Sequence, residues 1–301
     1  MAMMNPIYER EQKKEARSIR FSVLFLVLNA GLAAAALLSM ALALHQAGET
    51  GEMQYAAFLE IFRMLAWMEF AMAALLAPAG TVGCISGERE RKTLDLLRSS
   101  RMSPMEIAAG NLLSALSSVL VLLLGGAPVM ASVFLFGGIR ALQLLLLLGA
   151  CLLTGLLTGA IGLLFSSRSE TTGVAAAKAY TATAVLMFGP YGLNLLMRRL
   201  TFLVEGSRRL LLLSPLTTFS AALCQATGLE DGFLALAEHG VADPAQLIVR
   251  AVFCQLLMTA AVFFMAGRSV FMERHSRGAG FWRRLYRNRN IERGNTGADR
   301  R

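Results

Sequence analysis

The sequence is poor in the side chains on which most enzyme chemistry depends. It has only three His, at positions 45, 239 and 275, and no His-Glu-x-x-His pair that could bind zinc. None of them falls within a long apolar run, so a protease that works inside a membrane would lack its base. The four Cys have no Cys-x-x-Cys spacing, which favours packed thiols over a metal or redox centre.

A phosphate-binding loop is absent as well. The motif Gly-x-x-x-x-Gly-Lys-Ser/Thr needs a Lys followed by Ser or Thr, and among the few Lys only Lys92 meets that condition. Arg91 stands where the motif requires Gly. We therefore expect that this chain is not an enzyme by itself and that it holds neither a cofactor nor a metal.

Charge is scarce and apolar residues are abundant. Only 16% of the 301 residues are charged, 55% are hydrophobic and the mean hydropathy is +0.55. A soluble domain could not bury so much apolar surface, and the apolar residues are gathered into runs long enough to cross a bilayer. We predict an all-α polytopic membrane protein, with a single transmembrane domain over 1–301 and six transmembrane helices. These spans are expected at 21–44, 60–85, 107–136, 141–165, 174–197 and 247–270.

The Lys and Arg residues predict the orientation. With the N-terminus in the cytoplasm, the inner segments 1–20, 86–106 and 271–301, together with Arg168 and Arg268, hold 21 of the 29 Lys and Arg. We therefore expect a multi-pass protein of the cell (inner or plasma) membrane with both termini cytoplasmic. Attraction to anionic lipid headgroups accounts for the net charge of +9, and no nucleic-acid partner is expected.

The N-terminal segment contains a helix start. Asn5 is a good N-cap and Pro6 suits the first helical position. Apolar residues interspersed among the charges of 1–20 predict a short helix at the inner membrane surface. The alternative is a solvated positive flank that only sets the orientation.

The segment 86–106 between the second and third spans has the most distinctive pattern. Glu88 precedes Arg91 and Lys92 by three and four residues, a favourable helical spacing, and Leu94 and Leu97 add an apolar stripe. Ser103-Pro104-Met105-Glu106 is a capping box that begins the next helix. We predict a short charged helix, a break and re-entry into the membrane. Such a surface suits a partner protein, although a merely solvated helix would fit the same residues.

These motifs resemble those of a known family. Gly87–Leu97 (Gly-Glu-Arg-Glu-Arg-Lys-Thr-Leu-Asp-Leu-Leu), with the Ser-Pro-x-Glu helix start after it, resembles the first cytoplasmic loop of type-2 ABC exporter permeases. Asn5–Glu11 resembles the N-terminal elbow helix of that family. Phe165–Thr172 and Ser214–Leu216 are similar to family motifs in the same order. The likeness covers nearly the whole chain.

The resemblance implies a function and its partners. It implies the membrane-spanning permease subunit of an ATP-driven exporter, in which two permease chains, identical or different, assemble with two ATP-binding subunits that hold ATP and Mg²⁺. The first cytoplasmic loop would be a coupling helix that docks on the ATP-binding subunit. The implied coupling-interface residues are Glu88, Arg89, Glu90, Arg91, Lys92, Thr93, Leu94 and Leu97. The implied elbow residues are Asn5, Pro6, Tyr8, Glu9 and Arg10.

Two further regions invite a prediction. Glu69 falls midway along the second span, so it either faces a transport pathway or pairs with a neighbouring helix. In the outer loop 198–246, Ser214-Pro215 starts a helix that lies at the outer interface or dips back into the membrane. The alternatives to an ABC permease are an ion-coupled secondary carrier that uses Glu69, and a membrane anchor or sensor that transports nothing.

Overall fold

The described part of the chain is helical throughout. The computed structural model describes residues 6–16, 19–50, 55–93, 103–131, 139–200, 210–229 and 245–269. No strand occurs among them. The helices are α1 (Pro6–Ala16), α2 (Ile19–Thr50), α3 (Tyr55–Glu90), α5 (Pro104–Ala131), α6 (Ala141–Arg168), α7 (Thr172–Leu200), α9 (Pro215–Thr227) and a last helix, Ala245–Ser269.

Five of these helices are long and apolar enough to cross a membrane. They are α2, α3, α5, α6 and the last helix, and each contains most of one predicted span. The prediction of an all-α polytopic membrane protein is confirmed. The fifth predicted span, 174–197, lies in α7, which has 29 residues but is not among the five. The predicted third span extends to 136, beyond the end of α5 and outside the described residues.

The core of the bundle is the contact between α3 and α6, the most extensive between any two helices here. Small residues make it close, because Gly155 and Gly159 of α6 both lie against Ala77 of α3. One turn further, Gly162 approaches the backbone of Pro78. Gly155 and Gly159 have the Gly-x-x-x-Gly spacing that lets two helices approach closely, and here it brings α6 close to α3.

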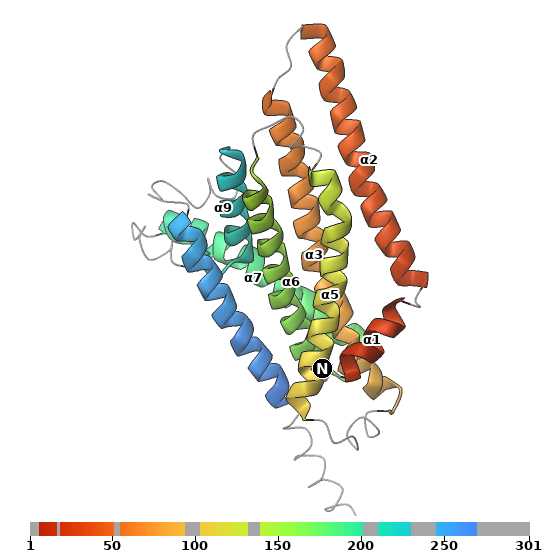
Figure 1. Ribbon diagram of the computed structural model, residues 1–301. Coiled ribbons are helices and arrows are strands. Elements are labelled where there is room, and N and C mark those ends of the chain that lie inside the picture. The colour runs from red at the N-terminus through yellow and green to blue at the C-terminus, as the bar shows by residue number, and fades with distance from the viewer. Residues whose placement is uncertain are drawn as a thin grey trace, which may run out of the picture.

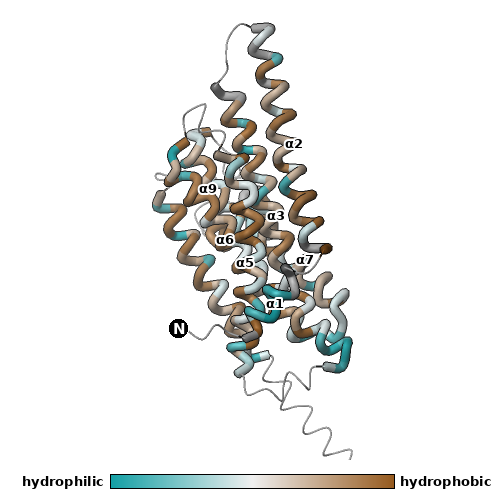
Figure 2. Tube along the Cα trace, turned by 45° about the vertical axis from the view of Figure 1, so that its right-hand side comes forward, coloured by the Kyte–Doolittle hydropathy of each residue, from teal (hydrophilic) through white to brown (hydrophobic). Residues whose placement is uncertain are grey.

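The remaining helices surround this pair. In Figure 1, α2 lies at one side of the bundle and the last helix (blue) at the other, with α1 near the lower end and α9 near the upper end. Much of α2 and of the last helix is exposed, apolar side chains included. Hydrophilic residues collect at α1 and the helix ends beside it, whereas the middle of the bundle is mostly apolar (Figure 2). This distribution matches the band that a bilayer would cover.

Helix α9 is held inside the bundle. Nearly all of its side chains are buried, and Phe219 stacks on Phe70 of α3 with ring centroids 4.3 Å apart. Pro215 occupies the first turn as predicted, but the hydroxyl of Ser214 donates to the Met187 carbonyl oxygen of α7 (2.7 Å) instead of capping the helix. Burial favours the prediction of a helix that dips back over one that lies at the interface. Within 198–246, residues 201–209 and 230–244 lie outside the described residues.

Candidate functional site

The charged segment that follows the second span is the end of α3 itself. The helix runs without a break to Glu90, so residues 87–90 form its last turn and not a separate helix. It ends in a Schellman arrangement, in which the Thr93 N–H donates to the Glu88 carbonyl and the Lys92 N–H to that of Arg89 (3.0 and 3.1 Å). Lys92 holds the left-handed conformation (φ 58°) that usually falls to Gly. The predicted break, between the charged segment and the helix start at Ser103, lies outside the described residues.

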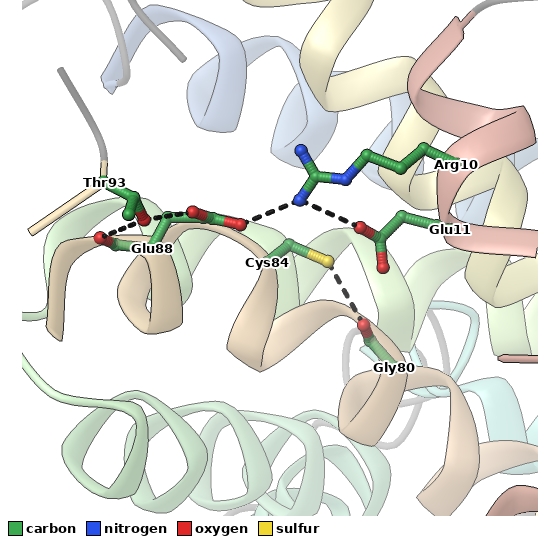
Figure 3. A network of polar contacts seen from close by, with 6 residues as sticks. All are labelled: Arg10, Glu11, Gly80, Cys84, Glu88 and Thr93. Atoms are coloured by element: carbon green, nitrogen blue, oxygen red, sulfur yellow. Dashed lines mark hydrogen bonds and ion pairs between the residues drawn. The ribbon is translucent and has the colours of Figure 1, made fainter. Parts of the chain in front are cut away.

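Glu88 joins this end of α3 to α1. Its Oε1 accepts a charged hydrogen bond from Arg10 Nη2 at 2.9 Å, and Arg10 also lies 3.5 Å from Glu11 of α1 (Figure 3). The other Glu88 oxygen accepts from the Thr93 hydroxyl, which also donates to the Glu88 carbonyl at 3.2 Å. One carboxylate therefore connects α1 with the residue at which α3 stops.

Arg89 binds the end of α6. Its guanidinium donates to the carbonyl oxygens of Ser167 (3.0 Å) and Ser169, which are among the acceptors that the helix end leaves without partners. A cation at a helix C-terminus is also favourable to the helix dipole. Arg89 therefore acts as a clamp between α3 and α6.

Glu90 binds the start of α7. Its carboxylate accepts from the Thr172 N–H at 2.8 Å and from the Thr172 hydroxyl at 3.0 Å. An anion at a helix N-terminus satisfies free N–H groups and suits the dipole. Arg89 and Glu90 thus fix the short connection between α6 and α7, where the sequence has the family-like motif Phe165–Thr172.

A further contact between α3 and α6 is buried. The Ser166 hydroxyl oxygen is buried and accepts the N–H groups of Ile85 (3.0 Å) and Ser86 (3.1 Å). Sequence reasoning missed Ser166, although it lies in the motif that was singled out. A Ser next to a helix end was the available signal, but nothing in the sequence identified the backbone groups that it binds.

Helix α1 has a second attachment. The Gln12 side-chain amide donates to the Ser117 hydroxyl of α5, and α1 packs along α5. Within α1, Lys13 Nζ donates to Glu9 at 2.6 Å, and this bond holds the pKa of the Glu9 carboxyl below its usual value. Tyr8 is half-buried, and Asn5 lies outside the described residues. The first predicted helix is therefore present and anchored at both α3 and α5.

The remaining predicted interface residues divide into two groups. Arg91 and Lys92 are exposed, and no described side chain pairs with either of them. Leu94 and Leu97 lie outside the described residues. We call the end of the bundle at which α1 meets the end of α3 the α1 end. The site there has two parts. Glu88 to Glu90 bind other helices of the chain, whereas Arg91 and Lys92 form an exposed positive surface.

Glu69 lies far from this site, in the core of the bundle. It lies in the middle of α3, 1% exposed, among core residues such as Phe62, Leu65 and Phe70. The structure therefore does not bring it to the α1 end, 19 residues further along the same helix.

The family model described as ABC-2 family transporter protein matches residues 5–275. The chain belongs to this family. The match extends from α1 through the last helix, and together with the five apolar helices it makes this ABC-2 protein a multi-pass membrane protein and a permease of an ABC transporter. Among curated proteins, none matches the chain in sequence.

Proposed function

We propose that the chain is the membrane-spanning permease subunit of an ATP-driven ABC exporter. A separate ATP-binding subunit, which holds ATP and Mg²⁺, docks at the α1 end and supplies the work. A second permease chain, identical or related, completes the transporter, and α2 and the last helix offer apolar faces for that chain and for lipid. Six spans, with α7 as the fifth, place both termini and the α1 end in the cytoplasm, as the Lys and Arg distribution predicts.

The observation that supports this function most is the set of contacts around Glu88, Arg89 and Glu90. Three consecutive side chains bind α1, α6 and α7 in turn. A push on the end of α3 is therefore transmitted to three other helices through hydrogen bonds to charged groups, which are stronger than neutral ones. This is what a coupling element needs in order to convert closure of the ATP-binding subunits into movement of the bundle.

The docking contact itself is assigned to the exposed positive surface of the site. Arg91 and Lys92 are exposed at the point where α3 ends, and Leu94 and Leu97 follow them in the sequence. Arg89 and Glu90 have intrachain partners, so their contribution is to position this surface. Helix α1, with Tyr8, Glu9 and Arg10, is the elbow that lies at the inner membrane surface and moves with it.

Arg91→Glu is the sharpest test, because Glu90→Arg would also remove the contact with the start of α7. We expect the reversed charge to reduce co-purification of the ATP-binding subunit and the response of its ATPase activity to the permease. Arg63→Glu is the matched control, because it makes the same charge change on α3 about eight turns away, where Arg63 pairs with Glu60 at 2.6 Å. Unchanged binding and ATPase response in Arg91→Glu and Lys92→Glu together would contradict the docking assignment.

A second candidate function is an ion-coupled secondary carrier. Glu69 is buried and has no hydrogen-bond partner among the described residues, which favours this function, because such a carboxyl inside a membrane protein often marks an ion pathway. Transport in energised vesicles without ATP distinguishes the two functions. The exporter predicts none, whereas the carrier predicts transport that Glu69→Gln abolishes.

A further inference from the structure

Glu69 of α3 lies against Gly126 of α5. Its Oε1 lies so close to Gly126 that a Cβ there would collide with it, and Leu32 of α2 lies 3.0 Å from the same Cβ position. The neighbouring Gly125 faces the Asn29 side-chain oxygen of α2, 2.8 Å from its own Cβ position. Three helices thus enclose a small polar site, in which Gly125 and Gly126 leave the space that Asn29 and Glu69 occupy.

Within the part of the chain that the structure describes, neither oxygen of Glu69 has a hydrogen-bond partner, and the residue is 1% exposed. Asn29 directs its amide N–H to the Phe25 carbonyl (3.0 Å) and only its oxygen toward Gly125. An ionised carboxylate that is buried without donors or a cation costs several kcal/mol or more, and such a group takes up a proton instead. The surroundings of Glu69 therefore suit a neutral carboxylic acid.

Among the described side chains, the titratable groups on the helices packed against α3 offer no compensating positive charge. The charged side chains described on those helices, Glu106, Arg168 and Lys178, are exposed, as is His45. The buried or half-buried titratable groups are thiols and phenols: Cys151, Tyr180, Tyr191 and Cys224. The tyrosine hydroxyls bond elsewhere, to the Leu75 carbonyl and to Thr217. On α3 itself, Arg63 pairs with Glu60.

A partner from outside the chain cannot supply that charge either. Glu69 is buried by its own chain, so a second permease chain or a lipid headgroup cannot reach it in this arrangement. A metal ion would need about six oxygen ligands, whereas the side chains gathered here offer the two oxygens of Glu69 and that of Asn29. A proton needs only one acceptor.

A cavity of about 200 Å³ lies between the same three helices, bounded by Phe25, Ala79, Gly80 and Ser118, among others. Phe25 also lies 2.8 Å from the Cβ position of Gly125. Apart from Ser118, the side chains that line this cavity are apolar, and Glu69 is not among them. The cavity is therefore spare room between α2, α3 and α5 and not a hydrated path to the carboxyl group.

We propose that Glu69 is a proton-binding site in the middle of the bundle, occupied at neutral pH, which exchanges its proton only when α2, α3 and α5 move apart. The neutral acid keeps α2 and α3 closed on Gly125 and Gly126. Loss of the proton creates a charge that the closed arrangement cannot accommodate. The proposal concerns the permease chain by itself and does not depend on the ATP-binding subunit.

Dicyclohexylcarbodiimide tests the proposal on the purified full chain. This apolar reagent adds to a protonated carboxyl group, takes up its proton and remains attached as an acylurea, so that no other reactant is needed. At neutral pH we expect the adduct on the peptide that contains Glu69, decreasing as the pH is raised. The internal control is Glu60, which is exposed and paired with Arg63 and should stay unmodified. Protection by sodium ions at constant pH would show a metal-cation site and overturn the proposal.

Infrared spectroscopy detects whether the Glu69 carboxyl group is protonated, without any reagent. The wild-type chain should show the band of a protonated carboxylic acid that Glu69→Gln lacks and that the matched variant Glu60→Gln retains. Gln has the shape of the neutral acid, so Glu69→Gln should fold, which elution as a monodisperse peak will verify. A wild-type spectrum that Glu69→Gln leaves unchanged in this region would overturn the proposal, whatever the labelling result.

Discussion

The Arg10 guanidinium of α1 lies 2.9 Å from the Glu88 carboxylate at the end of α3, although the two residues are 78 positions apart. Arg10 is about half exposed, so solvent screens this ion pair and its contribution to stability is small, about 0.2–1 kcal/mol. Its value is geometric, because it sets where α1 meets the end of α3.

The first prediction separates coupling from stability. Arg10→Glu should lower the unfolding temperature little but weaken the response of the partner ATPase to the permease, because like charges now separate α1 from α3. The double variant Arg10→Glu with Glu88→Arg should restore most of that response. The control is Lys13→Glu, since Lys13 pairs only within α1 with Glu9. An Arg10→Glu chain with normal coupling would contradict the role given to the pair.

The second prediction concerns the end of α3. Lys92 has φ 58°, a conformation that costs a side-chain residue about 1–2 kcal/mol and Gly almost nothing. Part of this gain is lost because Gly makes the unfolded chain more flexible. Lys92→Gly should therefore raise stability by about 0.5–1 kcal/mol in thermal unfolding. Lys92→Ala removes the same charge but keeps the left-handed strain, so a similar gain there would point to charge instead.

The third prediction concerns Ser166. Ser166→Ala would remove the buried hydroxyl oxygen that accepts from the N–H groups of Ile85 and Ser86. Each lost buried hydrogen bond costs about 1–3 kcal/mol, so the unfolding temperature should fall clearly. Thr181→Ala is a suitable comparison, because the exposed Thr181 hydroxyl bonds only to the Ala177 carbonyl of its own helix. Equal effects of the two variants would show that the contact between α3 and α6 is unimportant.

Local signals in the sequence predicted the helix starts well. The box at Ser103 forms as expected, with the Ser103 N–H 2.8 Å from Glu106 and the Glu106 N–H 3.2 Å from the Ser103 hydroxyl. Pro6 begins α1, and Pro215 begins α9. Such signals work because a capping residue bonds within three or four positions of itself, so both partners stand in the same stretch of sequence.

The contacts at the α1 end could not be predicted in this way. Arg89 and Glu90 stand beside each other in a charged run, which suggested a solvent-facing helix for a partner protein. Their actual partners are backbone groups of Ser167, Ser169 and Thr172, about 80 positions away. Every residue has backbone groups, so a sequence pattern does not distinguish those that a helix end leaves free. The charged run also suggested a short helix separate from the second span, whereas α3 continues through both to Glu90.

The last prediction tests the packing of α6 on α3. A Cβ at Gly162 would collide with the Thr81 hydroxyl and lie 3.1 Å from the Pro78 Cα, and that backbone cannot move aside easily. Overpacking of this kind costs about 1–3 kcal/mol, so Gly162→Ala should lower the unfolding temperature.

Gly149 lies on the same helix with no atom within 4 Å of its Cβ position. Because Ala is a better helix former than Gly, Gly149→Ala should be neutral or stabilising by up to about 1 kcal/mol. Adding Thr81→Ala to Gly162→Ala should recover only part of the loss, since the Pro78 backbone remains in place. If the double variant recovered the full stability of the wild type, the Thr81 side chain alone would limit the approach of the two helices. The backbone contact between α3 and α6 would then be looser than the distances indicate.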